Sequence, residues 1–257
     1  MPMHPLFALS LVIFMVNPVV RFATAQDSAK GNPTSIAIVE LFTSEGCSSC
    51  PPADALLREI NLKQANTGQL IVGISEHVTY WNDLGWKDPF SLPGFTDRQN
   101  VYASRLSPEG PYTPQMVLNG RDQFVGSDAG ALERALRDDA LRSHLHLSIL
   151  ASARSSSGLD VKLSVAGEMS GPLDIIAVLT DDADQSNVLR GENNGRLVQH
   201  VSVARLLTRV TTIRSDGEQS VHVTVPNGFL LGTGHHLILF AQEQHQGAIL
   251  GATTVPL

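Results

Sequence analysis

The sequence predicts an α/β domain followed by an all-β sandwich of the immunoglobulin-like type. Two patterns lead to this fold class. Up to about residue 142, apolar β-type runs alternate with amphipathic stretches of helical period, which is the order typical of βαβ units. After residue 143, about seven short β-type runs follow one another, with turn-forming stretches between them and no convincing helix. We therefore expect an α/β domain over residues 26–142 and a sandwich over residues 143–257.

The first 25 residues are set apart from the rest as an expected signal peptide. Leu6–Val20 is an almost continuous apolar run, and Ala23-Thr24-Ala25 has the small-x-small pattern of a signal-peptidase site. We expect cleavage after Ala25, a periplasmic or secreted mature chain, and no membrane span once the signal is removed. Ahead of the apolar run lies His4 but no Lys or Arg, so an uncleaved membrane anchor is the alternative.

The composition is that of a globular protein, with 42% hydrophobic and 17% charged residues. The formal net charge is −7, and neither half of the chain is basic. Binding of nucleic acids depends on Lys and Arg that neutralise phosphates, so the sequence predicts no nucleic-acid partner. It indicates no particular oligomeric state.

The first part of the chain predicts strand, helix and strand in that order. Residues 35–42 are mostly apolar with high β-propensity, as expected of a buried strand. Pro51 and Pro52 suit the first turn of a helix, where the missing N–H groups have no intrahelical partner. Residues 68–78 predict a second buried strand, so we expect a parallel pair with a right-handed crossover.

Further elements follow in the same part of the chain. The aromatic stretch 79–95 predicts a surface loop, and Thr96 is the expected cap of a helix that ends near residue 106. Residues 112–125 predict two strands joined by a hairpin turn at "NGRD", and residues 127–139 predict a capped helix. Beyond residue 143, strands are predicted by runs such as "LDVKLSV", "LDIIAVLTD" and "HHLILFAQEQ".

The two cysteines of the chain, Cys47 and Cys50, lie in the stretch "SEGCSSCPP". Three interpretations compete: a redox pair, two ligands of a metal, or a structural crosslink. A crosslink over two intervening residues closes a very short loop and restrains little of the unfolded chain. Ahead of a helix, the free N–H groups and partial positive charge favour a thiolate. In the redox interpretation Cys47 is the exposed nucleophile, and Cys50 resolves the mixed disulfide.

The order strand, C-x-x-C, helix, strand, helix and then "YTP" opening a hairpin resembles the thioredoxin fold. This resemblance implies that Pro114 is cis and packs against the disulfide, and that the backbone of Thr113 pairs with substrate peptide. Four stretches are similar to the DUF1223 family of exported bacterial thioredoxin-like proteins: "VELFTSEGCSSCPPAD", "HVTYWNDLGWKDPFS", "YTPQMVLNGRDQFVGSD" and "GENNGR…QH". The family label states no activity, so it implies fold and location more than function.

We therefore expect an exported thiol–disulfide oxidoreductase without a cofactor. Its partners would be protein dithiols or disulfides and an unidentified redox partner. Two alternatives stay open: a non-catalytic binding module, and copper binding or delivery. In the copper alternative, Cys47, Cys50 and His77 form a site of two sulfurs and one nitrogen, because His77 ends the second strand on the same edge.

Two further side chains are candidates for the site. Glu40, on the strand before the cysteines, is a candidate for proton transfer at Cys50. The alternative is a glutamate that faces solvent or pairs with a nearby Arg. Trp81 is a candidate for binding substrate, and the alternative is an aromatic residue that packs a long loop onto the domain.

Overall fold

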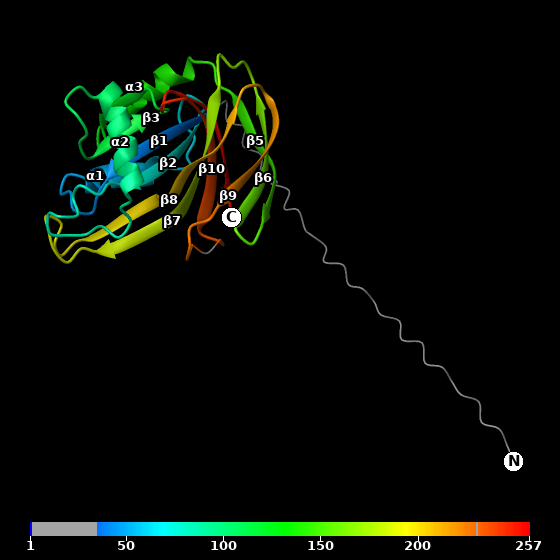
Figure 1. Cartoon of the computed structure of the whole chain (residues 1–257). Coiled ribbons are helices and arrows are strands. Elements are labelled where there is room, and N and C mark those ends of the chain that lie inside the picture. Colours follow the sequence, from blue (N-terminus) through cyan, green and yellow to red (C-terminus); the bar gives the residue numbers. More distant parts are fainter. Residues whose placement is uncertain (2–34, 230) are drawn as a thin grey trace.

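Figure 1 shows the computed structural model, which describes residues 1, 35–229 and 231–257. The expected signal peptide and its cleavage site lie, apart from Met1, outside the described residues. The described residues contain three helices, α1 (Pro51–Ile60), α2 (Pro93–Leu106) and α3 (Ala129–Ala140). The strands are β1 (Ile36–Thr43), β2 (Leu70–His77), β3 (Gln115–Leu118), β4 (Asp122–Val125), β5 (His146–Arg154), β6 (Gly158–Ala166), β7 (Leu173–Asn187), β8 (Leu197–Ile213), β9 (Gly217–Thr224), β10 (His235–Glu243) and β11 (Ile249–Pro256).

Eight of these strands form one mixed sheet in the order β11-β10-β7-β8-β2-β1-β3-β4. Strands β1 and β2 are parallel, as expected for a strand–helix–strand unit, and β8 is parallel to β2 where Ser75 pairs with Val203. The other neighbours in this sheet are antiparallel. Strands β5, β6 and β9 form a separate antiparallel sheet of three strands.

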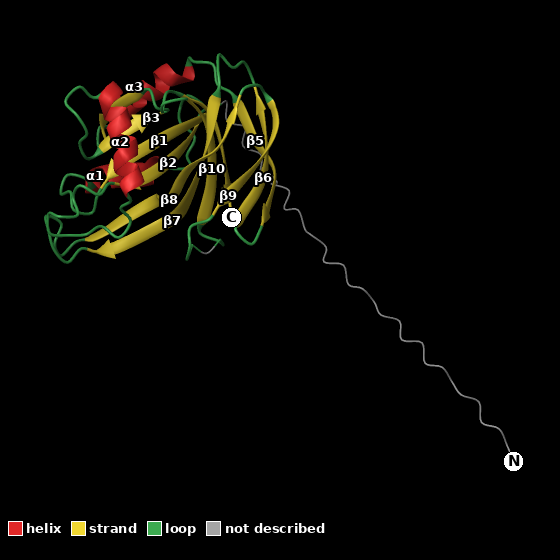
Figure 2. Cartoon of the chain, in the orientation of Figure 1, coloured by secondary structure: helices red, strands yellow, loops and turns green. Residues whose placement is uncertain are grey.

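The predicted fold class, an α/β thioredoxin-like domain followed by a separate all-β sandwich, is wrong. Strands make up 45% of the described residues and helices 16%, and the helices gather at one end of the molecule (Figure 2). Seven strands do follow residue 143, but four of them extend the sheet that β1–β4 begin. The two predicted domains share this sheet because β8 pairs with β2, which would otherwise be an edge strand. Where the chain divides into folding units stays a prediction.

Two hydrophobic cores lie on opposite faces of the large sheet. On one face, Val39 and Leu41 of β1 pack with Leu57 of α1 and Leu132 of α3. On the other face, alternate residues of β1 and β2 pack with strands from beyond residue 143. This second core contains Ile38, Val72, Ile74, Phe95, Ile176, Val178, Ala204, Ile238, Phe240, Ile249 and Ala252. Because its members come from both sides of position 143, the second half of the chain completes the core of the first.

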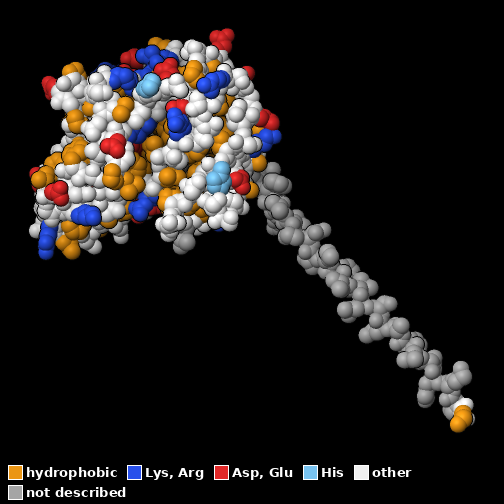
Figure 3. Space-filling model, viewed as in Figure 1, with side chains coloured by type: hydrophobic (Ala, Val, Ile, Leu, Met, Phe, Trp, Pro, Cys, Tyr) orange, Lys and Arg blue, Asp and Glu red, His pale blue; other side chains and the backbone are white. Residues whose placement is uncertain are grey.

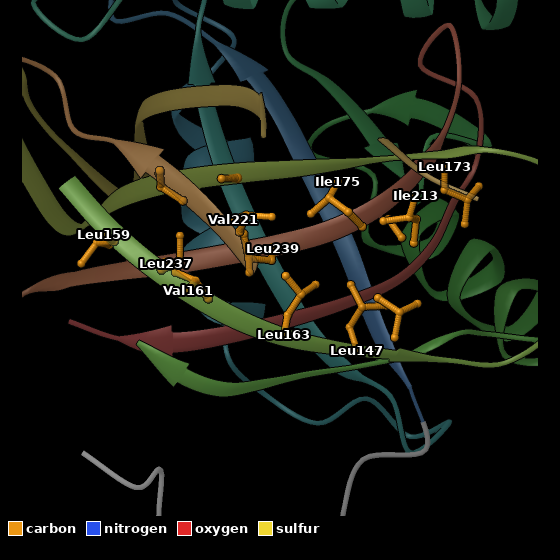
Figure 4. Close-up of a cluster of buried hydrophobic side chains, with 14 of the residues drawn as sticks. Leu147, Leu159, Val161, Leu163, Leu173, Ile175, Ile213, Val221, Leu237 and Leu239 are labelled. Carbon is orange, nitrogen blue, oxygen red and sulfur yellow. The ribbon is translucent and has the colours of Figure 1, made fainter. Parts of the chain in front are cut away.

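A third core joins the three-stranded sheet to the large one. Figure 4 shows side chains of β5, β6 and β9, such as Leu163 and Val221, directed toward Leu239 and Ile175 of the large sheet. Strict alternation in β6, where every second residue is buried, produces this apolar face. On the face of the molecule in Figure 3, Lys and Arg are interspersed with Asp and Glu, without a broad field of one sign.

Most of the local elements that the sequence predicts are present in the structure. Helix α1 begins with Pro51 and Pro52 in its first turn. The predicted hairpin turn between β3 and β4 is present, and Asn119 and Gly120 have positive φ of 45° and 62°, as is favourable for these residue types in such turns. Helix α2 begins at Pro93 instead of at Thr96, whose hydroxyl accepts a hydrogen bond from the N–H of Thr79 at 2.9 Å. None of the three described helices is long and apolar enough to cross a membrane.

Candidate functional site

Cys47 and Cys50 form a disulfide between the end of β1 and the start of α1, with 5.4 Å between their Cα atoms. The turn is held by its own backbone, since the N–H of Cys47 donates to the carbonyl of Ser44 and that of Cys50 to the carbonyl of Cys47. Cys50 is the N-cap residue of α1, and its carbonyl accepts the N–H groups of Ala53 and Asp54. The pair therefore lies at the partially positive end of the helix.

Both cysteines are fully buried, whereas Ser48 and Ser49 between them are exposed. The expected exposure of Cys47 is thus wrong for this state of the protein. A segment of the second half of the chain lies against this turn: residues 188–196 between β7 and β8, here called the 188–196 loop. In Figure 1 this yellow turn lies beside the long loop that follows β2, and Gly191 approaches Gly85 there.

Two side chains of the 188–196 loop bind the cysteine turn. The amide of Asn193 donates to the carbonyl oxygens of Glu45 and Cys47, both at 2.9 Å, and Asn193 itself is 1% exposed. A carboxylate oxygen of Glu192 accepts the N–H of Ser48 at 3.0 Å and its hydroxyl at 2.6 Å. These bonds lower the pKa of Glu192, since they favour its ionised form. The loop is therefore attached to the cysteine turn by two polar anchors.

Beside the cysteine turn lies a group of buried ionisable residues, here called the His–acid cluster: Glu45, Asp54, His77, Asp88 and His200. Glu45 precedes Cys47 in the turn, and Asp54 lies in the first turn of α1. The imidazole of His200 lies 3.4 Å from a carboxylate oxygen of Glu45 and 3.7 Å from one of Asp54. His77 is 2.7 Å from Asp88, and the two imidazoles meet edge to face, with 4.6 Å between their centroids.

The charges of the His–acid cluster are set by mutual attraction. Burial by itself lowers the pKa of His200, but Asp54 and Glu45 outweigh that effect and raise the pKa to about 9. Burial likewise acts to raise the pKa of Asp88, but His77 and the N–H groups of Glu45 and Phe90 lower it below its ordinary value. His200 is therefore a buried imidazolium at neutral pH, balanced by carboxylates that flank the cysteines in the chain.

The long loop after β2 ties the cluster to the cysteine turn. The indole N–H of Trp86 donates to Glu45 at 2.7 Å, and the N–H of Glu45 donates to Asp88 at 2.8 Å. Glu45 is thus held by its backbone, by its side chain and by Asn193. A turn held in this manner keeps one geometry for the cysteines.

A model of DUF1223, described as a protein of unknown function, matches residues 38–242. The chain belongs to the DUF1223 family. The matched region contains the cysteine turn, the 188–196 loop and the His–acid cluster, and it includes strands from both sides of residue 143.

The DUF1223 chain is also similar to a solved structure, that of protein AGR_C_4864 from Agrobacterium tumefaciens. The two chains are 27% identical, with a TM-score of 0.65 over 86% of this chain and 95% of that one. No curated protein matches the sequence.

The predicted substrate-binding residues lie around the cysteine turn of the DUF1223 chain. The Thr113–Pro114 peptide bond is cis, as the resemblance implies. The indole N–H of Trp81 donates to the hydroxyl of Thr113 at 2.8 Å, and the Cβ of Trp81 lies close to Gly46, one residue before Cys47. Pro114 is buried and lies close to Gly126, as does Ala53 of α1. Substrate binding by Thr113, Pro114 and Trp81 stays a prediction.

Glu40 lies on the other face of the sheet from α1. Its neighbours Val39 and Leu41 face α1, so Glu40 points toward α2, where it pairs with Arg98 and accepts the hydroxyl of Tyr102 at 2.7 Å. Nearby Glu76 is fully buried, and its burial, together with the charge of Glu40, raises its pKa well above the ordinary value. Glu40 therefore has the Arg partner that the alternative interpretation required, and proton transfer at Cys50 stays a prediction.

His77 lies in the His–acid cluster, fully buried between Asp88, Phe90 and His200. Among residues 35–229 and 231–257, no group of three or more His, Cys, Asp or Glu side chains is arranged to hold a metal ion. Copper binding by Cys47, Cys50 and His77 stays a prediction for the reduced protein.

Sequence reasoning missed Asn193, Glu192, His200 and three acids of the cluster as site residues. A signal was present, because the stretch "GENNGR…QH" was one of those that identified the family. Its residues reach the cysteines only through strand pairing, which no local pattern reveals.

Proposed function

We propose that this DUF1223 protein exchanges thiols and disulfides with other proteins through Cys47 and Cys50. The observation that carries the proposal is the bonded pair at the first turn of α1, in a turn fixed on both sides by buried hydrogen bonds. The free N–H groups at the start of a helix and its partial positive charge stabilise a cysteine thiolate. A thiolate is both the attacking and the leaving group in disulfide exchange.

The oxidising direction runs in two steps that balance. A thiolate of a substrate dithiol attacks Sγ of Cys47, the Cys47–Cys50 bond breaks, and Cys50 leaves as a thiolate. The second substrate thiolate then attacks the substrate sulfur of the mixed disulfide and releases Cys47. Two electrons pass from the substrate dithiol to the Cys47–Cys50 pair, and a redox partner that carries a disulfide accepts them afterwards. The reducing direction is the reverse, with a partner dithiol as the electron donor.

The surroundings support a role for the turn as a rigid reaction site. The imidazolium of His200 lies near the two carboxylates that flank the pair in sequence, Glu45 and Asp54, and offsets part of the negative charge that they place near a forming thiolate. Trp81 and Thr113 lie beside the turn and are the proposed contacts for a substrate peptide. The proposed compartment is periplasmic or extracellular, where disulfides persist.

Equilibration with glutathione redox buffers tests the proposal. A reduction potential between about −120 and −270 mV would support exchange, and one below about −300 mV would identify a structural bridge. Cys47→Ser should abolish disulfide transfer to a reduced model dithiol protein, while Ser156→Ala, at an exposed position between β5 and β6, should retain it. Transfer that persists in Cys47→Ser would contradict the proposed mechanism.

A further inference from the structure

The 188–196 loop occupies the place that a substrate of the cysteine pair needs. Both cysteines are fully buried, and the loop is bonded to Cys47 and Ser48 themselves, so a thiolate that reaches Sγ of Cys47 has to move part of this structure. We propose that a substrate segment displaces the loop and binds the same groups, and therefore carries a carboxylate side chain next to its reacting cysteine. This inference rests on the proposed function.

The groups that the loop uses define what can replace it. Ser48 presents two donors, its N–H and its hydroxyl, and both now bind one carboxylate oxygen of Glu192. Two donors that converge on one anionic acceptor favour a carboxylate over a neutral group, because such charge-assisted hydrogen bonds are the stronger ones. Ser48 is next to Cys47, so the replacing carboxylate lies beside the reacting sulfur.

The second anchor indicates a polypeptide as the occupant. The carbonyl oxygens of Glu45 and Cys47 both accept from the side-chain amide of Asn193. When the loop leaves, these two acceptors are free to receive backbone N–H groups or an amide of an extended segment. Together with Ser48, the turn offers two acceptors and two donors within four residues, 45–48, which matches an acidic peptide and not an apolar one.

The 188–196 loop is built to leave as a unit. Its ends are joined by a hydrogen bond from the N–H of Val188 to the carbonyl of Arg196 at 2.9 Å, and Gly195 donates to Val188 at 2.8 Å. Gly191 and Gly195 have φ of 74° and 79°, where glycine is favoured. These bonds do not involve the cysteine turn, so breaking the bonds of Asn193 and Glu192 to that turn leaves them in place.

The first test measures how fast dithiothreitol reduces the disulfide in the full chain. Asn193→Ala removes the two buried hydrogen bonds to the cysteine turn, and one that Arg196 donates within the loop, and should raise the rate constant about ten-fold, because a larger fraction of molecules has the loop displaced. Glu192→Gln, at an exposed position that cannot disturb the core, should raise it about two-fold. Asn194→Ala, at the exposed next residue of the loop, is the matched control and should react as the parent protein does.

The second test compares two peptides with a single cysteine that differ only in a Glu or a Gln beside it. Rates are divided by those of the same peptides with a small aromatic disulfide, which removes differences in thiol reactivity. The Glu peptide should react with the parent protein about three-fold faster, and Ser48→Ala should reduce this preference. Equal normalised rates for the two peptides would overturn the substrate assignment.

The outcomes separate the two proposals. Dithiothreitol reduces an accessible disulfide whether or not the protein acts on other proteins, so the first test does not depend on the proposed function. If Asn193→Ala and Glu192→Gln both react at the parental rate, the loop is not the barrier and the inference is wrong. If the variants react faster but no protein dithiol or disulfide is ever converted, the proposed function fails, and with it the substrate assignment.

Discussion

The buried imidazolium of His200 predicts how the stability of the protein depends on pH. The pKa of His200 is about 9 in the folded protein and 6.5 in an ordinary, solvated histidine. A group whose pKa is raised by folding stabilises the folded state fully below the unfolded value, and this contribution is lost as the pH rises through the folded value. At 1.36 kcal/mol for each pH unit, the difference corresponds to about 3 kcal/mol, lost between pH 6.5 and pH 9.

Replacing His200 with glutamine isolates this contribution, because the amide keeps polar contacts but does not titrate. Urea unfolding of the oxidised protein between pH 6 and pH 10 should show His200→Gln losing about 3 kcal/mol less over this range than the parent protein. The oxidised protein has no free thiol to titrate in the same range. His146→Gln, at an exposed histidine of β5, should follow the parent curve. Parallel curves for His200→Gln and the parent protein would refute the assignment of a buried imidazolium.

Two further substitutions test contacts on the two faces of β1. Glu40→Gln should cost about 3 kcal/mol in urea unfolding, because it leaves the buried guanidinium of Arg98 without its closest carboxylate; a cost below about 1 kcal/mol would show that Glu76, at 3.8 Å, replaces it. Gly126→Ala should cost about 1–3 kcal/mol in the same assay, because its Cβ would lie 2.9 Å from Leu41, 3.0 Å from Ala53 and 3.1 Å from Pro114; unchanged stability would show that these side chains move apart without strain.

Single strands and helix starts could be predicted, because the residues that determine them are neighbours in the sequence. The apolar run at residues 35–42 and the two prolines at 51 and 52 gave β1 and the start of α1 within one residue. The error at α2 is also physical: Pro93 can begin a helix just as well as Thr96 can cap one. What could not be predicted is the pairing of β2 with β8, since a run of alternating residues has the same appearance in a sandwich and in an extended sheet.

The residues of the candidate site also fall into those that the sequence predicts and those that it does not. Cys47 and Cys50 were found because their spacing and the helix that follows are visible in a few residues of sequence. His200 and Asn193 were not found, because they lie about 150 residues after the cysteines in the chain. The pairing of β7 with β8 brings them to the cysteine turn. A lone histidine on a strand and an asparagine in a turn have ordinary structural explanations, and only the folded arrangement shows what they touch.

The cysteines and the 188–196 loop lie far apart in the chain, so they are synthesised at different times. Asn193 follows Cys47 by 146 residues, so the thiols leave the ribosome long before the loop that buries them exists. Through that interval the segment that is bonded to the cysteine turn in the folded protein has not been made, so the accessibility of both sulfurs depends on how far synthesis and folding have advanced. Full burial of the pair is complete only when β7 and β8 have paired and brought residues 188–196 to the turn.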